Sequence, residues 1–260
     1  MADDQVLYDA PVAGVARITF NSPAARNRWG RAQREMTDAF VTRALADPDV
    51  RAVVLTGAGG HFTAGGDIKE FGTFEVVEQL GNVRAAQTMA RRILHADKPF
   101  IAAVEGYAAG AGVGAACLCD LIIGDPSTRF VVSFAKIGMT PDLGLHQTLS
   151  HRVGVARARR MLLRAETVGA EEALRIGLLD ELVPTGGVQG RALEIAAEFA
   201  AAPPNALAGI KRGILLTALA MEAVLEYEAA AMAVSLTGRE VAEGARAFLE
   251  KRPPNYRQEP

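Results

Sequence analysis

The sequence has few cysteines, few aromatic residues and almost no net charge. Its two cysteines, Cys117 and Cys119, lie two positions apart, where one structural element cannot easily bridge them. We therefore expect buried, reduced thiols and a cytoplasmic protein. A formal net charge of -2 excludes a general attraction to nucleic acid or anionic membranes, so an anionic ligand would need a local cluster of positive charge.

The sequence also lacks the patterns of export and membrane insertion. Its opening residues, MADDQVLYD, carry acids where a secretory signal carries Lys or Arg, and no stretch resembles a membrane span once glycine and alanine are discounted. The 260 residues have 50% hydrophobic content, which is enough to bury a sizeable core. We expect one soluble domain with an appendage.

Residues 99–120 (PFIAAVEGYAAGAGVGAACLCD) form the most informative stretch. The apolar run 100–104 predicts a strand covered on both faces, and the small residues 115–119 predict a buried helix. The segment between them carries Gly106, Gly110, Gly112 and Gly114. Such a loop suits a tight strand-to-helix packing, or backbone amides that bind a phosphate or a developing oxyanion. The phosphate interpretation is weak, because neither GxxxxGK[ST] nor a clean GxGxxG is present.

The rest of the chain predicts an α/β fold followed by helices alone. Strands are expected at 12–20 and 50–56, with a helix at 31–46 between them, and strands 52–55 and 100–104 are expected to be parallel. A second glycine turn, 61–69, leads into a polar segment, so both turns point at one crevice. The other predicted helices are 83–94, 155–163, 170–176, 191–201, 206–218, 221–236 and 239–251.

Several motifs in this order resemble the crotonase superfamily, the enoyl-CoA hydratases and isomerases. They are PAARN (23–27), AGGDIK (64–69), KPFIAAVEG (98–106), the glycine loop ending at Cys119-Asp120, Ile137-Gly138, and EKRPP (250–254). The resemblance implies a spiral of ββα units over 1–190 that binds acyl-CoA, and a helical trimerisation region over 191–260. It also implies a homotrimer or dimer of trimers, an acyl-CoA thioester substrate, and no metal or redox cofactor.

The resemblance further implies an oxyanion hole for a thioester enolate. By motif position, its two donors are the backbone N–H groups of Gly66 and Ala111. Removing one such donor typically lowers the rate by about 100- to 1000-fold.

The acid and base residues of the family are only partly present. Hydratases of the superfamily use two glutamates, but the motif places Gly114 and Phe134 at these positions, which argues against an ordinary hydratase. Asp142 is the remaining acid and resembles the single base of some enoyl-CoA isomerases; a turn residue after Pro141 is the simpler interpretation. An atypical hydratase, an aryl-CoA dehalogenase-like enzyme and a non-catalytic acyl-CoA-binding protein remain alternatives.

Binding of CoA is expected at a few residues of the motifs. The resemblance gives Arg26, Ala64, Lys69, Phe248 and Lys251 as candidates, with a neighbouring subunit as a second possible source of the last two. Lining of the acyl pocket is expected from Phe62, Phe71, Phe74, Phe134 and Leu143. Glu105 and His146 are weaker catalytic candidates, whereas Asp67 and Asp120 are expected to be structural.

Overall fold

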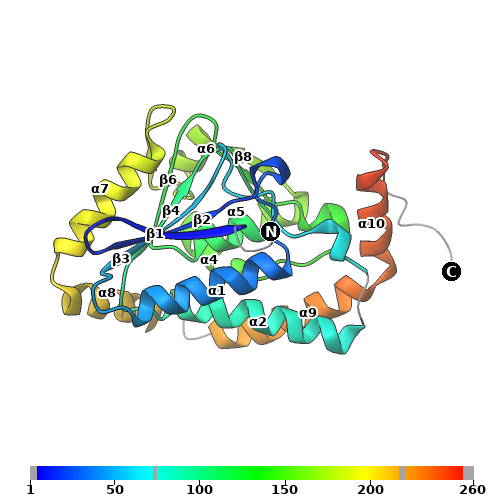
Figure 1. The fold of residues 1–260 in the computed structure, drawn as a ribbon. Helices are drawn as coiled ribbons and strands as arrows, with labels where there is room; N and C mark the ends of the chain where they lie inside the picture. Colours follow the sequence, from blue (N-terminus) through cyan, green and yellow to red (C-terminus); the bar gives the residue numbers. More distant parts are fainter. Residues whose placement is uncertain (1–4, 73–74, 217–220, 254–260) are drawn as a thin grey trace.

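The computed structural model describes residues 5–72, 75–216 and 221–253 (Figure 1). Within these residues, six strands form one sheet in the order β1-β2-β3-β4-β6-β9, and three form a second in the order β5-β7-β8. The strands are β1 (Val6–Val12), β2 (Val15–Phe20), β3 (Ala52–Gly57), β4 (Phe100–Val104), β5 (Tyr107–Ala109), β6 (Leu121–Gly124), β7 (Arg129–Val131), β8 (Thr167–Gly169) and β9 (Glu181–Leu182).

The larger sheet is parallel except at its first pair. Strands β1 and β2 are antiparallel and joined by a turn at Gly14, whose φ is +78°, so the strand predicted at 12–20 is divided. The prediction that β3 and β4 are parallel is confirmed, with Val53 opposite Phe100. Every residue of both strands is buried, which explains their continuous apolar sequence.

Alternating residues of the strands face two separate cores. Val53 and Leu55 pack with helices α1 (Arg31–Ala46) and α2 (Val76–Leu94) on one side, whereas Ala52 and Val54 pack with α7 (Val188–Ala201) on the other. The helices are α1 (Arg31–Ala46), α2 (Val76–Leu94), α3 (Ala111–Cys117), α4 (Leu145–Val153), α5 (Val155–Arg164), α6 (Ala170–Arg175), α7 (Val188–Ala201), α8 (Pro204–Leu216), α9 (Met221–Thr237) and α10 (Arg239–Leu249).

The C-terminal helices do not form a separate layer. Helix α9 lies along α2, and α10 projects at the opposite end of the molecule from α7 (Figure 1). Gly244 of α10 packs so closely that an added Cβ would lie 2.8 Å from the Ile137 Cα. The boundary predicted after residue 190 falls inside α7, which packs on the sheet, and the division into two domains stays a prediction.

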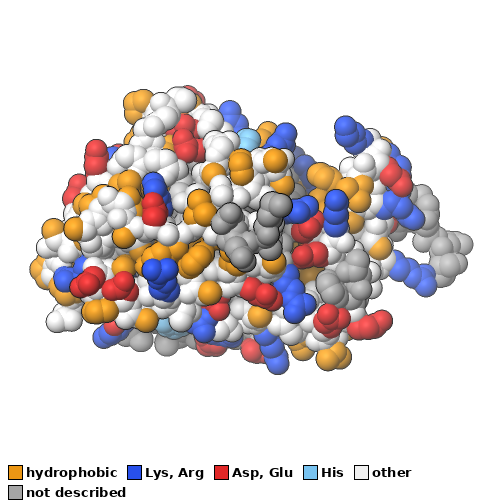
Figure 2. All heavy atoms as spheres, viewed as in Figure 1, with side chains coloured by type: hydrophobic (Ala, Val, Ile, Leu, Met, Phe, Trp, Pro, Cys, Tyr) orange, Lys and Arg blue, Asp and Glu red, His pale blue; other side chains and the backbone are white. Residues whose placement is uncertain are grey.

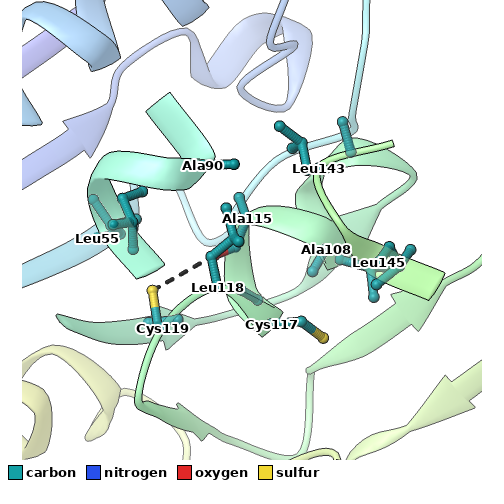
Figure 3. Packing of buried hydrophobic residues seen from close by; sticks show 14 of the residues in the cluster. Leu55, Ala90, Ala108, Ala115, Cys117, Leu118, Cys119, Leu143 and Leu145 are labelled. Carbon is teal, nitrogen blue, oxygen red and sulfur yellow. Dashed lines mark hydrogen bonds between the residues drawn. The ribbon is translucent and has the colours of Figure 1, made fainter. Parts of the chain in front are cut away.

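The surface and the cysteines agree with the composition. Charged side chains of both signs are interspersed over the face drawn in Figure 2. None of the helices in the described ranges is long and apolar enough to span a bilayer. Both cysteines are free and buried, as predicted, and burial raises the pKa of Cys117 to about 11. Cys119 Sγ donates to the Ala115 carbonyl at 3.5 Å (Figure 3).

Candidate active site

The two glycine turns are fastened together by a short parallel bridge. Thr63 pairs with Ala108, and the Ala109 N–H donates to the Thr63 carbonyl at 3.0 Å. Gly66 follows Thr63 by three residues, just as Ala111 follows Ala108. The register therefore brings the Gly66 and Ala111 residues to the wall of one cavity.

Glycine is required where the two turns approach each other. Gly65 has φ +86°, and a Cβ there would lie 2.6 Å from the Ala109 carbonyl oxygen. Gly110, with φ +51°, precedes the first residue of α3. Within the described part of the chain, neither the Gly66 nor the Ala111 N–H donates to a protein acceptor, so both can serve a ligand.

The cavity between these turns and the helices has a volume of about 100 Å³. Its wall comes from the two turns, from α1, α2 and α9, and from the segment between β7 and α4. The residues that line it include Arg31, Arg34, Ala64, Gly66, Glu70, Phe71, Ala111, Phe134, Asp142, Met232 and Leu236.

Asp142 is half-buried at this wall, and its Oδ1 atom is buried. No described residue forms a hydrogen bond with its Oδ1 atom. Burial, and next the neighbouring Glu228 carboxylate, raise the pKa of Asp142 from 3.8 to about 6, although Arg34 opposes them. The carboxyl is therefore largely ionised at neutral pH and still basic enough to accept a proton.

The loop after Asp142 is held by α9. Leu143 and Gly144 both have left-handed backbones, with φ of 54° and 72°. The buried Glu228 carboxylate accepts the Gly144 N–H at 2.7 Å, and its other oxygen lies 2.7 Å from His146 Nδ1. Because an anion is favourable at a helix N-terminus, Glu228 stabilises both the start of α4 and the turn that presents Asp142.

Glu228 was not predicted, although one clue was present. It is an acid within a mostly apolar helix, so its burial required a partner elsewhere in the chain. His146, a weak candidate from the sequence, contacts this acid and does not line the cavity with Asp142.

The positions of the two family glutamates hold no carboxyl group. A Cβ on Gly114 would lie 3.1 Å from the Leu143 Cβ, so the leucine fills the space that a side chain at 114 would need. Phe134 is 4% exposed and presents a ring to the cavity. Glu70, a second acid at the wall, accepts the Arg31 N–H and was missed by the sequence analysis.

Of the predicted site residues, the structure brings together Gly66, Ala111, Asp142 and Ala64. It does not bring the other expected CoA contacts to this wall. The Arg26 guanidinium lies over the Tyr107 ring, 5.7 Å from its centroid, while Lys69, Phe248 and Lys251 are exposed. Their contacts with CoA stay predictions.

Some of the residues expected to line the acyl pocket lie at the cavity, and others do not. Phe71 and Phe134 line the cavity, Phe62 and Leu143 are buried in the core, and Phe74 lies outside the described residues. Asp120 accepts the Phe100 N–H at 2.8 Å, Asp67 accepts the Lys69 N–H at 3.1 Å, and Glu105 accepts from Gln189 at 3.2 Å. Asp67 and Asp120 therefore have the structural contacts expected of them.

Two backbone amides and a half-buried acid line one cavity, and backbone N–H donors in such a site can stabilise an oxyanion. The sequence model of the enoyl-CoA hydratase/isomerase family matches residues 11–259. The chain belongs to this family and has the crotonase fold, as the resemblance predicted.

Similar proteins cover nearly the whole chain. A probable enoyl-CoA hydratase of Rhodobacter capsulatus is 37% identical over 251 residues, 94% of either chain. A 2,3-dehydroadipyl-CoA hydratase of Escherichia coli is 31% identical, covering 94% of this chain and 95% of that one. The crystal structure of an enoyl-CoA hydratase from Mycobacterium avium subsp. paratuberculosis K-10 superposes with a TM-score of 0.89 at 29% identity, covering 98% and 99%.

Proposed function

We propose that this protein is an enoyl-CoA isomerase in which Asp142 transfers the proton. The observation that carries the proposal is the Asp142 carboxyl, whose Oδ1 atom is buried and has no partner among the described residues, in the cavity that also contains Gly66 and Ala111. The bare N–H groups of those two residues would hold the thioester oxygen, which gains negative charge when the substrate is deprotonated. This chemistry requires only the CoA thioester and groups of the protein.

One carboxylate is enough for moving a double bond. Asp142 would remove a proton from C2 of a 3-enoyl-CoA, and the C–H electron pair would pass into a dienolate whose oxygen binds the two amides. The same carboxyl would return the proton to C4, giving the 2-enoyl-CoA and regenerating the carboxylate. The pKa of about 6 suits both halves of this exchange near neutral pH.

Hydration is the second candidate, and Glu70 favours it. Its carboxylate lines the same cavity as Asp142, so two acids are present to handle the protons of a water molecule. The similar proteins described above carry hydratase names. Against hydration, the Glu70 carboxylate accepts the first N–H of α1, and Gly114 and Phe134 replace the family glutamates.

Three substrates and two variants separate the candidates. The wild type would be assayed with a 3-enoyl-CoA, a 2-enoyl-CoA and an aromatic acyl-CoA, beside Asp142→Asn and Glu70→Gln. We expect isomerisation that is lost in Asp142→Asn and kept in Glu70→Gln. Hydration lost in Glu70→Gln would favour the hydratase, turnover of a halogenated aromatic thioester would favour a dehalogenase-like enzyme, and binding without turnover would indicate a non-catalytic protein.

We also propose that the protein works as a cytoplasmic homotrimer or dimer of trimers. Exposed apolar side chains on the C-terminal helices, Ile210, Val234 and Leu249, support association through this region. Light scattering of the purified protein would give a mass of three or six chains, and a monomeric mass would contradict the proposal.

A further inference from the structure

The cavity lined by Gly66, Ala111 and Asp142 also contains two arginines that the proposed proton transfer does not require. Arg31 and Arg34, both in the first turns of α1, line the cavity with Asp142. Cations are unfavourable at a helix N-terminus, and the acid that offsets them at the start of α1 is Glu70, from another segment, because the first turn of the helix contains none. The two arginines themselves do not stabilise the start of the helix, and an anionic ligand in the cavity would explain their charge.

The two arginines differ in their partners. Arg31 forms an ion pair with Glu35 at 3.0 Å on the outer face of α1. Arg34 is half-buried and donates one Nη1 bond to the Trp29 carbonyl at 3.1 Å. No carboxylate of the described residues forms an ion pair with Arg34, and a guanidinium has five N–H donors. Most of its hydrogen-bonding capacity is thus left for a ligand.

The neighbouring acid, Asp142, does not occupy the remaining N–H donors of Arg34. Asp142, on the same wall, has an Oδ1 atom without a partner among the described residues, so it does not form a two-pronged pair with Arg34. An anionic group of the substrate beside Asp142 would be repelled by the ionised carboxylate. Arg34 would offset that repulsion and supply the two parallel N–H groups that suit a carboxylate.

The volume of the cavity limits the length of the acyl chain that it can hold. A cavity of roughly 150 Å³ in another protein holds one benzene molecule. The volume here is about 100 Å³, so the space suits a short chain. Thioester carbon and carboxylate would then lie only a few carbons apart.

We propose that Arg34 binds a second carboxylate on the acyl group, so that the substrate is a short dicarboxylic acyl-CoA. This inference rests on the proposed binding of an acyl-CoA in the cavity, but not on isomerisation. Phe71, Met232 and Leu236 pack around the carbon chain, whereas Gly66 and Ala111 hold the thioester oxygen at its other end.

Binding of two saturated thioesters of equal chain length tests the proposal without requiring turnover. Succinyl-CoA carries the second carboxylate, and butyryl-CoA has a methyl group in its place. Titration calorimetry with the wild type should show tighter binding of succinyl-CoA by about 10- to 100-fold, the range for a charge-assisted pair. Arg34→Met should abolish this preference, and Arg34→Lys should keep part of it.

Arg43→Met is the matched control, because Arg43 lies on the same helix and outside the cavity. It should bind both thioesters as the wild type does. Equal affinity of the wild type for both ligands would overturn the proposal, as would an equal loss of both affinities in Arg34→Met, which indicates a contact with CoA itself. If neither thioester binds, the proposed acyl-CoA function fails as well; loss of isomerisation alone leaves the binding preference standing.

Discussion

Removing the charge of Asp142 should make the folded protein more stable at neutral pH while removing its activity. The residue is half-buried with its Oδ1 atom buried, and desolvation raises its pKa from 3.8 to about 6 in the folded state. A difference of about 2 in pKa corresponds to about 3 kcal/mol. Because the folded pKa is raised, this stability is present below the unfolded pKa and is lost as the pH rises through about 6.

Asp142→Asn does not titrate, and a buried amide has the same contacts at every pH. The difference in unfolding free energy between this variant and the wild type should therefore increase by about 3 kcal/mol, in favour of the variant, between about pH 4 and about pH 8. Urea unfolding at a fixed protomer concentration measures it, with Asp49→Asn as an exposed control. A difference that is constant with pH would refute the assignment of Asp142 as a buried, titrating acid.

Three further predictions follow from the site and its support. Gly65→Ala should lower kcat by about 100- to 1000-fold, because the new Cβ would displace the turn that carries the Gly66 amide; a near-normal kcat would contradict this. Glu228→Gln should move the acidic limb of the kcat/KM profile to lower pH, because the negative charge that raises the pKa of Asp142 is gone; an unmoved limb would indicate only a structural role. Lys98→Met should reduce the unfolding free energy by about 1.5–3 kcal/mol, because the ammonium donates to the carbonyls of residues 44, 45 and 47 at the end of α1; unchanged urea midpoints would count against that cap.

The sequence predicted the core of the fold where local pattern and burial agree. The helix at 31–46 and the parallel strands β3 and β4 were expected, because an apolar run bounded by breakers specifies a buried strand. The segment before residue 83 was expected to be a polar loop, yet α2 begins at Val76. Its first two turns are mostly exposed, so they carry little apolar periodicity.

The helix after Gly144 was not predicted, because its sequence carries little local signal for a helix start. Helix α4 contains polar residues on much of its surface. The carboxylate at its N-terminus belongs to Glu228 of α9. No local capping residue marks its start, because a long-range contact supplies the carboxylate.

The site could be predicted only in part for a related reason. Gly66, Ala111 and Asp142 lie within motifs, so their place in one cavity could be anticipated. Arg34 and Glu70 have no such pattern, because which side of a half-buried helix or turn faces a cavity depends on packing between distant segments.

The central claim is that one acid, Asp142, shuttles a proton over an enolate held by two amides. NMR of a 2-enoyl-CoA incubated with the enzyme in heavy water tests it most directly. Reversal of the proposed transfer predicts deuterium at C4 and formation of 3-enoyl-CoA, both abolished in Asp142→Asn, with little 3-hydroxyacyl-CoA. Rapid formation of 3-hydroxyacyl-CoA that persists in Asp142→Asn would contradict the account.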